Sequence, residues 1–367
     1  MNSLVFSNML HRPMRTFVSI FGIGMGVLLI VFTTGLANGS LRERAQREAN
    51  VGAEILFRPS GSMGLTGSDS LSLNVDLASE IRKIEGVENA IPIAQNTASA
   101  KDANTGSRLV DGVNFDEYAR MAGLKVVEGR KFVDGEDEVM ADTGWLPQHK
   151  LKVGDSIDLY ERKFKLVGTY DPGAGGRIKI SLATLQKQLG AENRASAFLI
   201  KVKNGVTPET AAANINKKFP DNQIIFTKDL EELYLQSIPA LNIFLNVVIG
   251  VAGVVSALII LLTMYTTVTE RTRQIGVLKS LGMSTVGISS IVVQEALLMS
   301  VGGVVSGVLM TILLKFILTR TTTLNVQIEF GIILIIITMG VLSGLIGALY
   351  PALRAARLDA VDALSYE

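Results

Sequence analysis

The sequence predicts an α-helical membrane protein with four transmembrane helices in a 1+3 arrangement and a mixed α/β extracytoplasmic domain inserted between helices 1 and 2. The chain of 367 residues is 48% hydrophobic and 19% charged, whereas soluble domains have about 25% charged residues. Its charges are also unevenly placed, because residues 41–232 carry 26 Lys and Arg and 28 Asp and Glu. A polar domain therefore interrupts apolar segments, which excludes a single soluble core.

Long apolar runs predict the four membrane helices. Residues 16–40 contain no charge and supply the ~20 apolar positions that cross a ~30 Å hydrocarbon core. A cleaved signal peptide is the alternative, but its apolar region would be only ~7–15 residues long, so a retained anchor is favoured. The later runs are residues 233–269, 281–314 and 330–353. We predict membrane helices at residues 17–40, 237–268, 285–314 and 330–353.

Positive charges in the short flanking segments predict the orientation, because Lys and Arg are retained on the cytoplasmic side. The loop at residues 315–329 carries Lys315 and Arg320, and it is expected outside. The cytoplasmic segments are then residues 1–16, 269–284 and 354–367, whose positive residues are Arg12, Arg15, Arg271, Arg273, Lys279, Arg354 and Arg357. The sequence thus predicts a multi-pass protein of the cytoplasmic (inner) membrane with both termini cytoplasmic and residues 41–236 outside.

The polar domain has the pattern of a mixed α/β fold. Residues 40–49 continue the first helix as a stalk, and apolar positions at helical spacing predict a helix at residues 76–84. A second helix is expected at residues 207–219, where Pro208 suits the first turn. Strand-like runs lie at residues 53–57, 108–113, 156–159, 164–170 and 197–202.

Several function classes lack the residues they need. The net charge is +1 without a basic stripe, cysteine is absent, and His11 and His149 are the only histidines; nucleic-acid binding, thiolate chemistry and multi-histidine metal sites therefore have no support. No G-x-x-x-x-G-K-[ST] loop occurs, so we predict no catalytic, cofactor or metal site in this chain. The glycine-rich residues 173–176 are interpreted as a surface loop. The acidic group Asp134, Glu136, Asp137 and Glu138 does not have calcium-loop spacing and is interpreted as a solvated turn.

Two features inside the apolar runs indicate a packed bundle. Glu295 is the acid within a membrane run, where pairing with a neighbouring helix and a proton or substrate role are both open. Small residues recur at four-residue spacing, which permits close helix approach in lipid. The predicted helix-packing residues are Gly22, Gly26, Gly303, Gly307, Gly340 and Gly344.

Residues 269–284 form the most informative stretch. Ile275, Leu278 and Leu281 repeat every three residues between positive charges, a pattern typical of a segment that lies at the membrane surface. On this evidence an interfacial connector and a helix that docks a partner protein are both possible interpretations.

This stretch resembles the cytoplasmic coupling segment of FtsX/MacB-type, mechanotransmission ABC transporter permeases, whose pattern is roughly E-R-x-R-E-I-G-[IV]-L-[KR]-[AS]-[LI]-G. Gln274 stands where Glu is usual, and Ala360 stands where proline commonly follows Asp359 near the end of the chain. The resemblance extends to the plan of one span, a large outside domain and three further spans. The residues that it marks for coupling to an ATPase are Glu270, Arg271, Arg273, Ile275, Gly276, Leu278, Lys279 and Gly282.

The resemblance implies how such a chain works. The permeases act in pairs, with a homodimer favoured here over a heterodimer, and each copy docks a separate ATPase subunit that binds ATP and magnesium. Nucleotide-driven movement passes through the helices to the outside domain. Membrane lipid and a periplasmic adaptor are further candidate partners.

Three functions are compatible with this implied mechanism. The first is a permease that exports a hydrophobic or amphiphilic drug, peptide or lipid. The second is a lipoprotein-releasing permease like LolC and LolE. The third is a signalling regulator of cell-wall hydrolases like cell-division FtsX, in which the outside domain is usually smaller.

Overall fold

The computed structural model describes residues 13–60, 71–100, 106–236, 238–321 and 326–358. The chain divides into two compact units. We call Met1–Ser40 with Pro239–Glu367 the membrane unit and Leu41–Ile238 the α/β unit. One helix, α2 (Pro13–Ala49), runs through the division at Ser40. The predicted helical continuation through residues 40–49 is therefore confirmed.

The membrane unit consists of long apolar helices. Four helices in the described residues have the length and composition to cross a membrane: α2, α9 (Pro239–Glu270), α11 (Thr285–Thr321) and α12 (Phe330–Arg357). A short helix, α10 (Thr272–Ser280), lies between α9 and α11 in the sequence. A helix satisfies its backbone hydrogen bonds internally, which is why apolar sequences of this length form helices in lipid.

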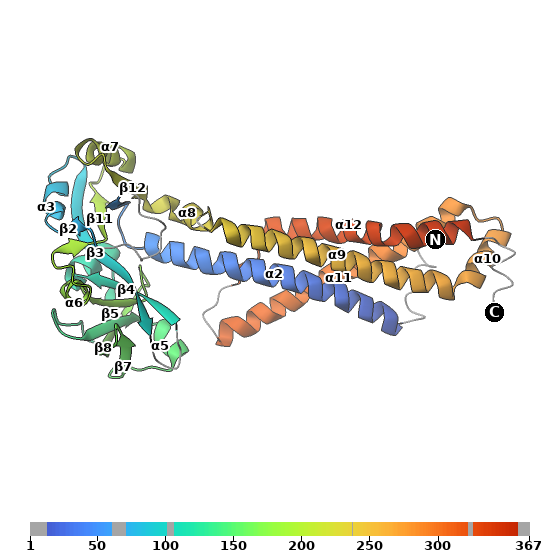
Figure 1. Cartoon of the computed structure of the whole chain (residues 1–367), viewed down its shortest axis with the longest axis horizontal. Helices are drawn as coiled ribbons and strands as arrows, with labels where there is room; N and C mark the ends of the chain where they lie inside the picture. The colour runs from blue at the N-terminus through green and yellow to red at the C-terminus, as the bar shows by residue number, and fades with distance from the viewer. Residues whose placement is uncertain (1–12, 61–70, 101–105, 237, 322–325, 359–367) are drawn as a thin grey trace. The chain divides into compact units, whose positions relative to one another are not determined.

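The helices of the membrane unit pack through two buried apolar clusters. Helix α12 contacts both α9 and α11 along its length, as Figure 1 shows for the yellow, orange and red ribbons. One cluster surrounds Ile260, Met299 and Ala352, and the other surrounds Val27, Val304 and Ile336. Both clusters combine residues from α2, α9, α11 and α12, so all four long helices contribute to each cluster.

The α/β unit is built on a ten-stranded sheet of order β12-β1-β11-β3-β4-β9-β6-β8-β5, with β7 paired to β8. The β4–β9 and β6–β8 pairs are parallel and the other pairs are antiparallel. A second, two-stranded sheet joins β2 and β10. The strands are β1 (Ile55–Pro59), β2 (Leu73–Asn74), β3 (Val87–Ala100), β4 (Gly106–Val113), β5 (Lys125–Gly129), β6 (Glu138–Asp142), β7 (Ser156–Leu159), β8 (Arg162–Asp171), β9 (Ile178–Ser181), β10 (Arg194–Ala195), β11 (Ala197–Val202) and β12 (Asn222–Phe226).

Strand β3 joins the two halves of the large sheet. Its first half pairs with β11 and its second half, from Ala94 onward, pairs with β4. Helices α3 (Leu77–Ile81) and α7 (Pro208–Lys218) pack on the half that contains β1 and β11 through a core around Phe57 and Ile215. The half that contains β9 and β6 has its own core around Leu166, with α5 (Trp145–His149) and α6 (Leu182–Gln188).

A third core holds the last turns of α2 against the sheet. Ala45 of α2 packs with Tyr234 of α8 (Leu230–Gln236), and with Phe115 and Tyr118 of α4 (Phe115–Ala122). Because Ala45 is 1% exposed, this end of α2 is part of the α/β core. A three-residue 3-10 helix, η1 (Thr227–Asp229), precedes α8.

Candidate functional sites: the coupling helix and the α2 latch

Helix α10 is the element that the coupling motif forms. Helix α9 ends at Glu270, and Arg271 occupies the N-cap position of α10 with a non-helical backbone. Gly282, which follows α10, has φ +91°, a conformation that glycine adopts without steric cost. The chain therefore turns at both ends of α10, which separates this nine-residue helix from the membrane helices on either side.

The motif residues of α10 divide between two faces. Ile275 and Gly276 are buried, and Ile275 packs with Val268 of α9 and Val292 of α11. On the other side Arg273 is exposed, as are Val277 at 42% and Leu281 at 79%. Positions four apart lie on one helical face, so the outward residues form one surface. Of the other predicted coupling residues, Glu270 and Gly282 are exposed, and Arg271, Leu278 and Lys279 are half-buried.

Polar and aromatic contacts connect the helices around α10. Arg15 of α2 donates to Glu270 at the end of α9, with 2.9 Å between Arg15 Nη1 and Glu270 Oε2. Tyr265 of α9 stacks on Tyr350 of α12 at a ring-centroid distance of 6.3 Å. The Arg354 guanidinium lies 4.6 Å from the centroid of the Tyr265 ring. The end of α9 is thus attached to α2 and to α12 immediately before α10 begins.

The six glycines of the predicted packing set lie against other helices. A Cβ atom built on Gly307 of α11 would lie 2.5 Å from Val27 Cβ of α2, and one on Gly340 of α12 would lie 2.6 Å from Val304 Cγ2 of α11. Both distances are shorter than real side chains allow. The remaining four glycines face α9, α2 and α11, with the pairs being Gly22–Ile259, Gly26–Ser256, Gly303–Ile23 and Gly344–Ser300.

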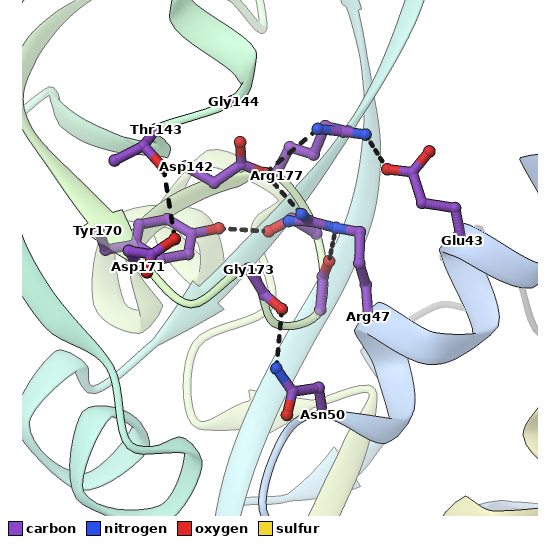
Figure 2. A network of polar contacts seen from close by, with 12 residues as sticks. Glu43, Arg47, Asn50, Asp142, Thr143, Gly144, Tyr170, Asp171, Gly173 and Arg177 are labelled. Atoms are coloured by element: carbon purple, nitrogen blue, oxygen red, sulfur yellow. Dashed lines mark hydrogen bonds and ion pairs between the residues drawn. The ribbon is translucent and has the colours of Figure 1, made fainter. Parts of the chain in front are cut away.

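In the α/β unit, the end of α2 binds the loop between β8 and β9 (Figure 2), and we call these contacts the α2 latch. Arg47 Nη1 lies 2.7 Å from Asp142 Oδ2, and Arg47 Nε donates to the Gly175 carbonyl at 3.1 Å. Asn50 Nδ2 donates to the Gly173 carbonyl at 3.1 Å. Arg177 completes the latch by pairing with Glu43, and its Nη1 lies 3.4 Å from Asp142 Oδ2.

A buried ion pair supports the latch loop from the other side. Lys179 and Asp111 are 0% and 2% exposed, with 3.0 Å between Lys179 Nζ and Asp111 Oδ2. The Gly176 N–H donates to the same carboxylate oxygen at 2.6 Å. Lys179 Nζ also lies 4.4 Å from the centroid of the Tyr118 ring, a cation–π contact. Burial lowers the pKa of Lys179, whereas the Asp111 carboxylate acts in the opposite direction.

The sequence did not predict the latch, and the interpretation of residues 173–176 as a surface loop is wrong: residues 174–176 are buried, with Ala174 0% exposed. Glu43 and Arg47 are four residues apart and so lie on one face of α2, and Asn50 directly follows the helix. This spacing was the available signal, but their partners in β6 and the β8–β9 loop are about a hundred residues away in the sequence. The acidic group has local partners: Glu138 pairs with Arg130, Asp137 with Arg162, and Asp134 accepts from Ser181.

Comparison with known proteins identifies the class. The sequence profile of the MacB-like periplasmic core domain matches residues 16–218, and that of the FtsX-like permease C-terminal region matches residues 246–360. Because the first profile covers more than half of the chain, the protein belongs to the MacB/FtsX family of ABC transporter permeases. The prediction made from the coupling motif is confirmed. The protein is thus a membrane protein with an extracytoplasmic domain.

The chain is similar to the following individual proteins. The ABC transporter permease MJ1507 of Methanocaldococcus jannaschii is 23% identical, covering 100% of this chain and 97% of the relative. The macrolide export ATP-binding/permease protein MacB of Bdellovibrio bacteriovorus is 22% identical, and the alignment covers 99% of this chain but 61% of that protein. The periplasmic region of MacB from Actinobacillus actinomycetemcomitans is a structural neighbour, with 14% identity and a TM-score of 0.38 over 51% of this chain and 95% of that one.

Proposed function

We propose that this permease couples ATP hydrolysis by a separate ATPase subunit to movement of its extracytoplasmic α/β unit, and so exports a hydrophobic or amphiphilic substrate. ATP and magnesium would bind to the partner. In this proposal both termini and α10 are cytoplasmic, and two copies of the chain act together. The substrate class is supported by the relatives named macrolide export proteins, since a macrolide is a large amphiphilic molecule.

The observation that carries this proposal is the exposed face of α10. Apolar Val277 and Leu281 are 42% and 79% exposed beside the charged Arg273, while the opposite face of the same helix is buried. A mixed apolar and basic surface on a short helix suits insertion into a groove of a partner protein. Nucleotide can bias two states of the permease only if the ATPase contacts those states differently, and this face is where we expect that contact.

The route to the α/β unit in this proposal is helix α2. The helix continues without interruption from Pro13 to Ala49, and its last turns are bonded to the β8–β9 loop through the latch. A displacement of α2 along or about its axis would therefore be transmitted to the sheet through Arg47 and Asn50. This arrangement does not require a polar path for the substrate through the membrane unit.

Co-purification with a co-expressed ABC ATPase subunit tests the proposal. The double variant Arg273→Asp/Val277→Asp places two acidic groups on the exposed face of α10 and is expected to abolish binding of the ATPase while the chain still inserts. The matched control is Arg357→Asp, near the end of α12. Retention of the ATPase by the double variant, or labelling that places Arg273 outside the cell, contradicts the proposal.

Two other functions can be distinguished from export by the activity that an assay detects. Release of a lipid-anchored protein from the membrane into solution would indicate a permease like LolC and LolE. Activation of a cell-wall hydrolase without movement of any substrate would indicate a regulator like FtsX. Export is favoured because the MacB profile matches the inserted domain.

A further inference from the structure

Helix α10 is attached to the bundle at its first end by a buried ion pair. Arg271 Nη1 lies 3.6 Å from Glu295 Oε2 of α11, and the two side chains are 12% and 3% exposed. A carboxylate in a membrane helix is costly unless it is paired, and removal of one partner from a buried pair leaves an uncompensated charge. This contact therefore resists separation of Arg271 from α11.

A second attachment lies at the other end of α10. Lys279 Nζ donates to the carbonyl oxygens of Ala356 and Leu358 at 3.2 and 2.5 Å. These carbonyls belong to the end of α12, where the last turn of a helix has no intrahelical donors. A lysine ammonium also interacts favourably with the negative end of the helix dipole. Lys279 thus binds α10 to the end of α12.

The middle of α10 is held less closely. A cavity of about 360 Å³ is lined by Arg271, Gln274, Ile275, Val277 and Leu278 on one side and by Ile288, Ile291 and Val292 of α11 on another. Van der Waals attraction is lost wherever a gap separates two surfaces. The polar contacts at the two ends therefore add to the packing of Ile275 in attaching α10 to the membrane helices.

We infer that Arg271 and Lys279 are positioning residues that fix the coupling helix to α11 and α12, and that the ATPase contacts the opposite, outward face. A single attachment would let a short helix pivot, whereas attachment at both ends defines its direction. Displacement of α10 by the ATPase is then passed to α11 and α12 directly, as well as along the chain from α9. This inference rests on the proposed function and divides the coupling motif into anchoring residues and docking residues.

The absence of cysteine from the chain allows a test that does not need the ATPase. Ile275→Cys places a thiol on the buried face, and Ser280→Cys places one at an exposed position that does not line the cavity. The full-length chain in native membranes is treated with a polyethylene glycol maleimide too large for the cavity. Arg271→Met and Lys279→Met are each expected to raise the labelling rate at Ile275→Cys about tenfold. This rise corresponds to an about tenfold larger equilibrium constant for the movement of α10 away from the membrane helices.

Matched variants separate positioning from general damage. Labelling at Ser280→Cys should not change, and Arg273→Met, which removes a positive charge from the outward face, should leave Ile275→Cys protected. The charge exchange Arg271→Glu/Glu295→Arg and the conservative Lys279→Arg should restore protection. Unchanged labelling at Ile275→Cys in both Met variants, or equal exposure in Arg273→Met, overturns the inference.

A second measurement uses the complex with the ATPase. Arg271→Met is expected to retain the ATPase during purification but to lose its effect on the rate of ATP hydrolysis, whereas Arg273→Asp loses the ATPase itself. Loss of ATPase binding in Arg271→Met with Ile275→Cys still protected would make Arg271 a docking contact and overturn the inference. Failure of the unsubstituted chain to bind the ATPase would instead contradict the proposed function, and the labelling result would still decide the inference.

Discussion

Arg47 and Asp142 form the most buried ion pair of the α2 latch, with 2.7 Å between Arg47 Nη1 and Asp142 Oδ2 and with side chains 14% and 4% exposed. Burial distinguishes this pair from Arg42 and Glu231, which pair at 2.9 Å from the same helix but are 26% and 43% exposed. The two pairs therefore allow the contribution of the latch to be measured against a control in the same helix.

We expect Arg47→Ala to lower the free energy of unfolding of the α/β unit by about 3 kcal/mol, because it leaves the buried Asp142 carboxylate with one weaker partner. Arg42→Ala should lower it by less than about 1 kcal/mol, as is usual for exposed pairs. Urea unfolding followed by the fluorescence of Trp145 measures both, since this residue is the single tryptophan of the chain and is buried in the α/β unit. Equal losses in the two variants would show that the latch adds no stability.

Gly175 provides a second test of the latch loop. Its φ is +59°, and a Cβ atom there would lie 2.6 Å from Asp111 Oδ2 and 2.7 Å from Tyr118 Oη. Gly190 has a nearly identical φ of +62° with nothing within 4 Å of its Cβ position. Gly190→Ala should therefore cost only the ~1–2 kcal/mol of the left-handed conformation.

Gly175→Ala is expected to cost a further ~2 kcal/mol or more, because the methyl group must displace the buried Asp111 carboxylate from its partners. Thermal unfolding of both variants, followed by Trp145 fluorescence, makes the comparison. A Gly175→Ala protein as stable as Gly190→Ala would mean that the loop moves away from Asp111 at little cost.

The membrane helices could be predicted from the sequence because a single physical constraint determines them. A segment in hydrocarbon must satisfy its own backbone hydrogen bonds and present apolar side chains, and both requirements are local. Strands β7 and β11 were also predicted with the bounds observed, since their apolar and β-branched residues lie in short runs between turns.

Strand β3 shows why the rest of the fold could not be predicted. It contains Pro92, a residue that lacks the N–H donor of a strand ladder, and Pro92 lies in the half of β3 that pairs with β11, opposite Phe198. Its second half is a run of small and polar residues with little strand preference. Pairing of its first half with β11 and of its second half with β4 decides its conformation, and this information lies outside the segment. The α2 latch could not be predicted for the same reason, since residues 43–50 and 142–177 come into contact only in the folded unit.

The coupling motif alone also did not predict which residues of α10 lie on its buried face and which on its exposed face. The family pattern marks Arg271, Arg273 and Lys279 as equivalent positive positions. Their roles separate only when Glu295 and the end of α12 are placed opposite Arg271 and Lys279. The sequence left the role of Glu295 open between pairing and chemistry, and the structure places it in a pair.

Glu48 gives the α/β unit a dependence on pH. It lies near the end of α2, beyond the apolar part of that helix, and burial raises its pKa from 4.5 to about 7, although Tyr234 and Arg44 act in the opposite direction. Because the folded state binds this proton more tightly than the unfolded state, the contribution of Glu48 to stability is fully present below pH 4.5. That contribution is lost as the pH rises through about 7.

The expected loss is on the order of 3 kcal/mol between pH 4.5 and 8. Glu48→Gln cannot ionise, so its free energy of unfolding should increase relative to that of the unsubstituted chain across this window. Urea unfolding at several pH values, again followed by Trp145 fluorescence, tests the expectation. Parallel curves for the two proteins would show that Glu48 keeps an ordinary pKa in the folded unit.

Close helix packing in the membrane unit is tested by comparing two glycines. A Cβ atom on Gly307 would lie 2.5 Å from Val27 Cβ and 2.6 Å from the Gly24 carbonyl oxygen, whereas one on Gly250 of α9 has nothing within 4 Å. Gly307→Ala should therefore force α2 away from α11 and destabilise the bundle by about 2 kcal/mol. Gly250→Ala should be neutral or slightly stabilising, because alanine favours the helix. Unfolding by sodium dodecyl sulfate in mixed micelles, followed by circular dichroism, measures both. Similar midpoints would mean that α2 and α11 separate without cost, and the four-residue glycine pattern would then reflect composition alone.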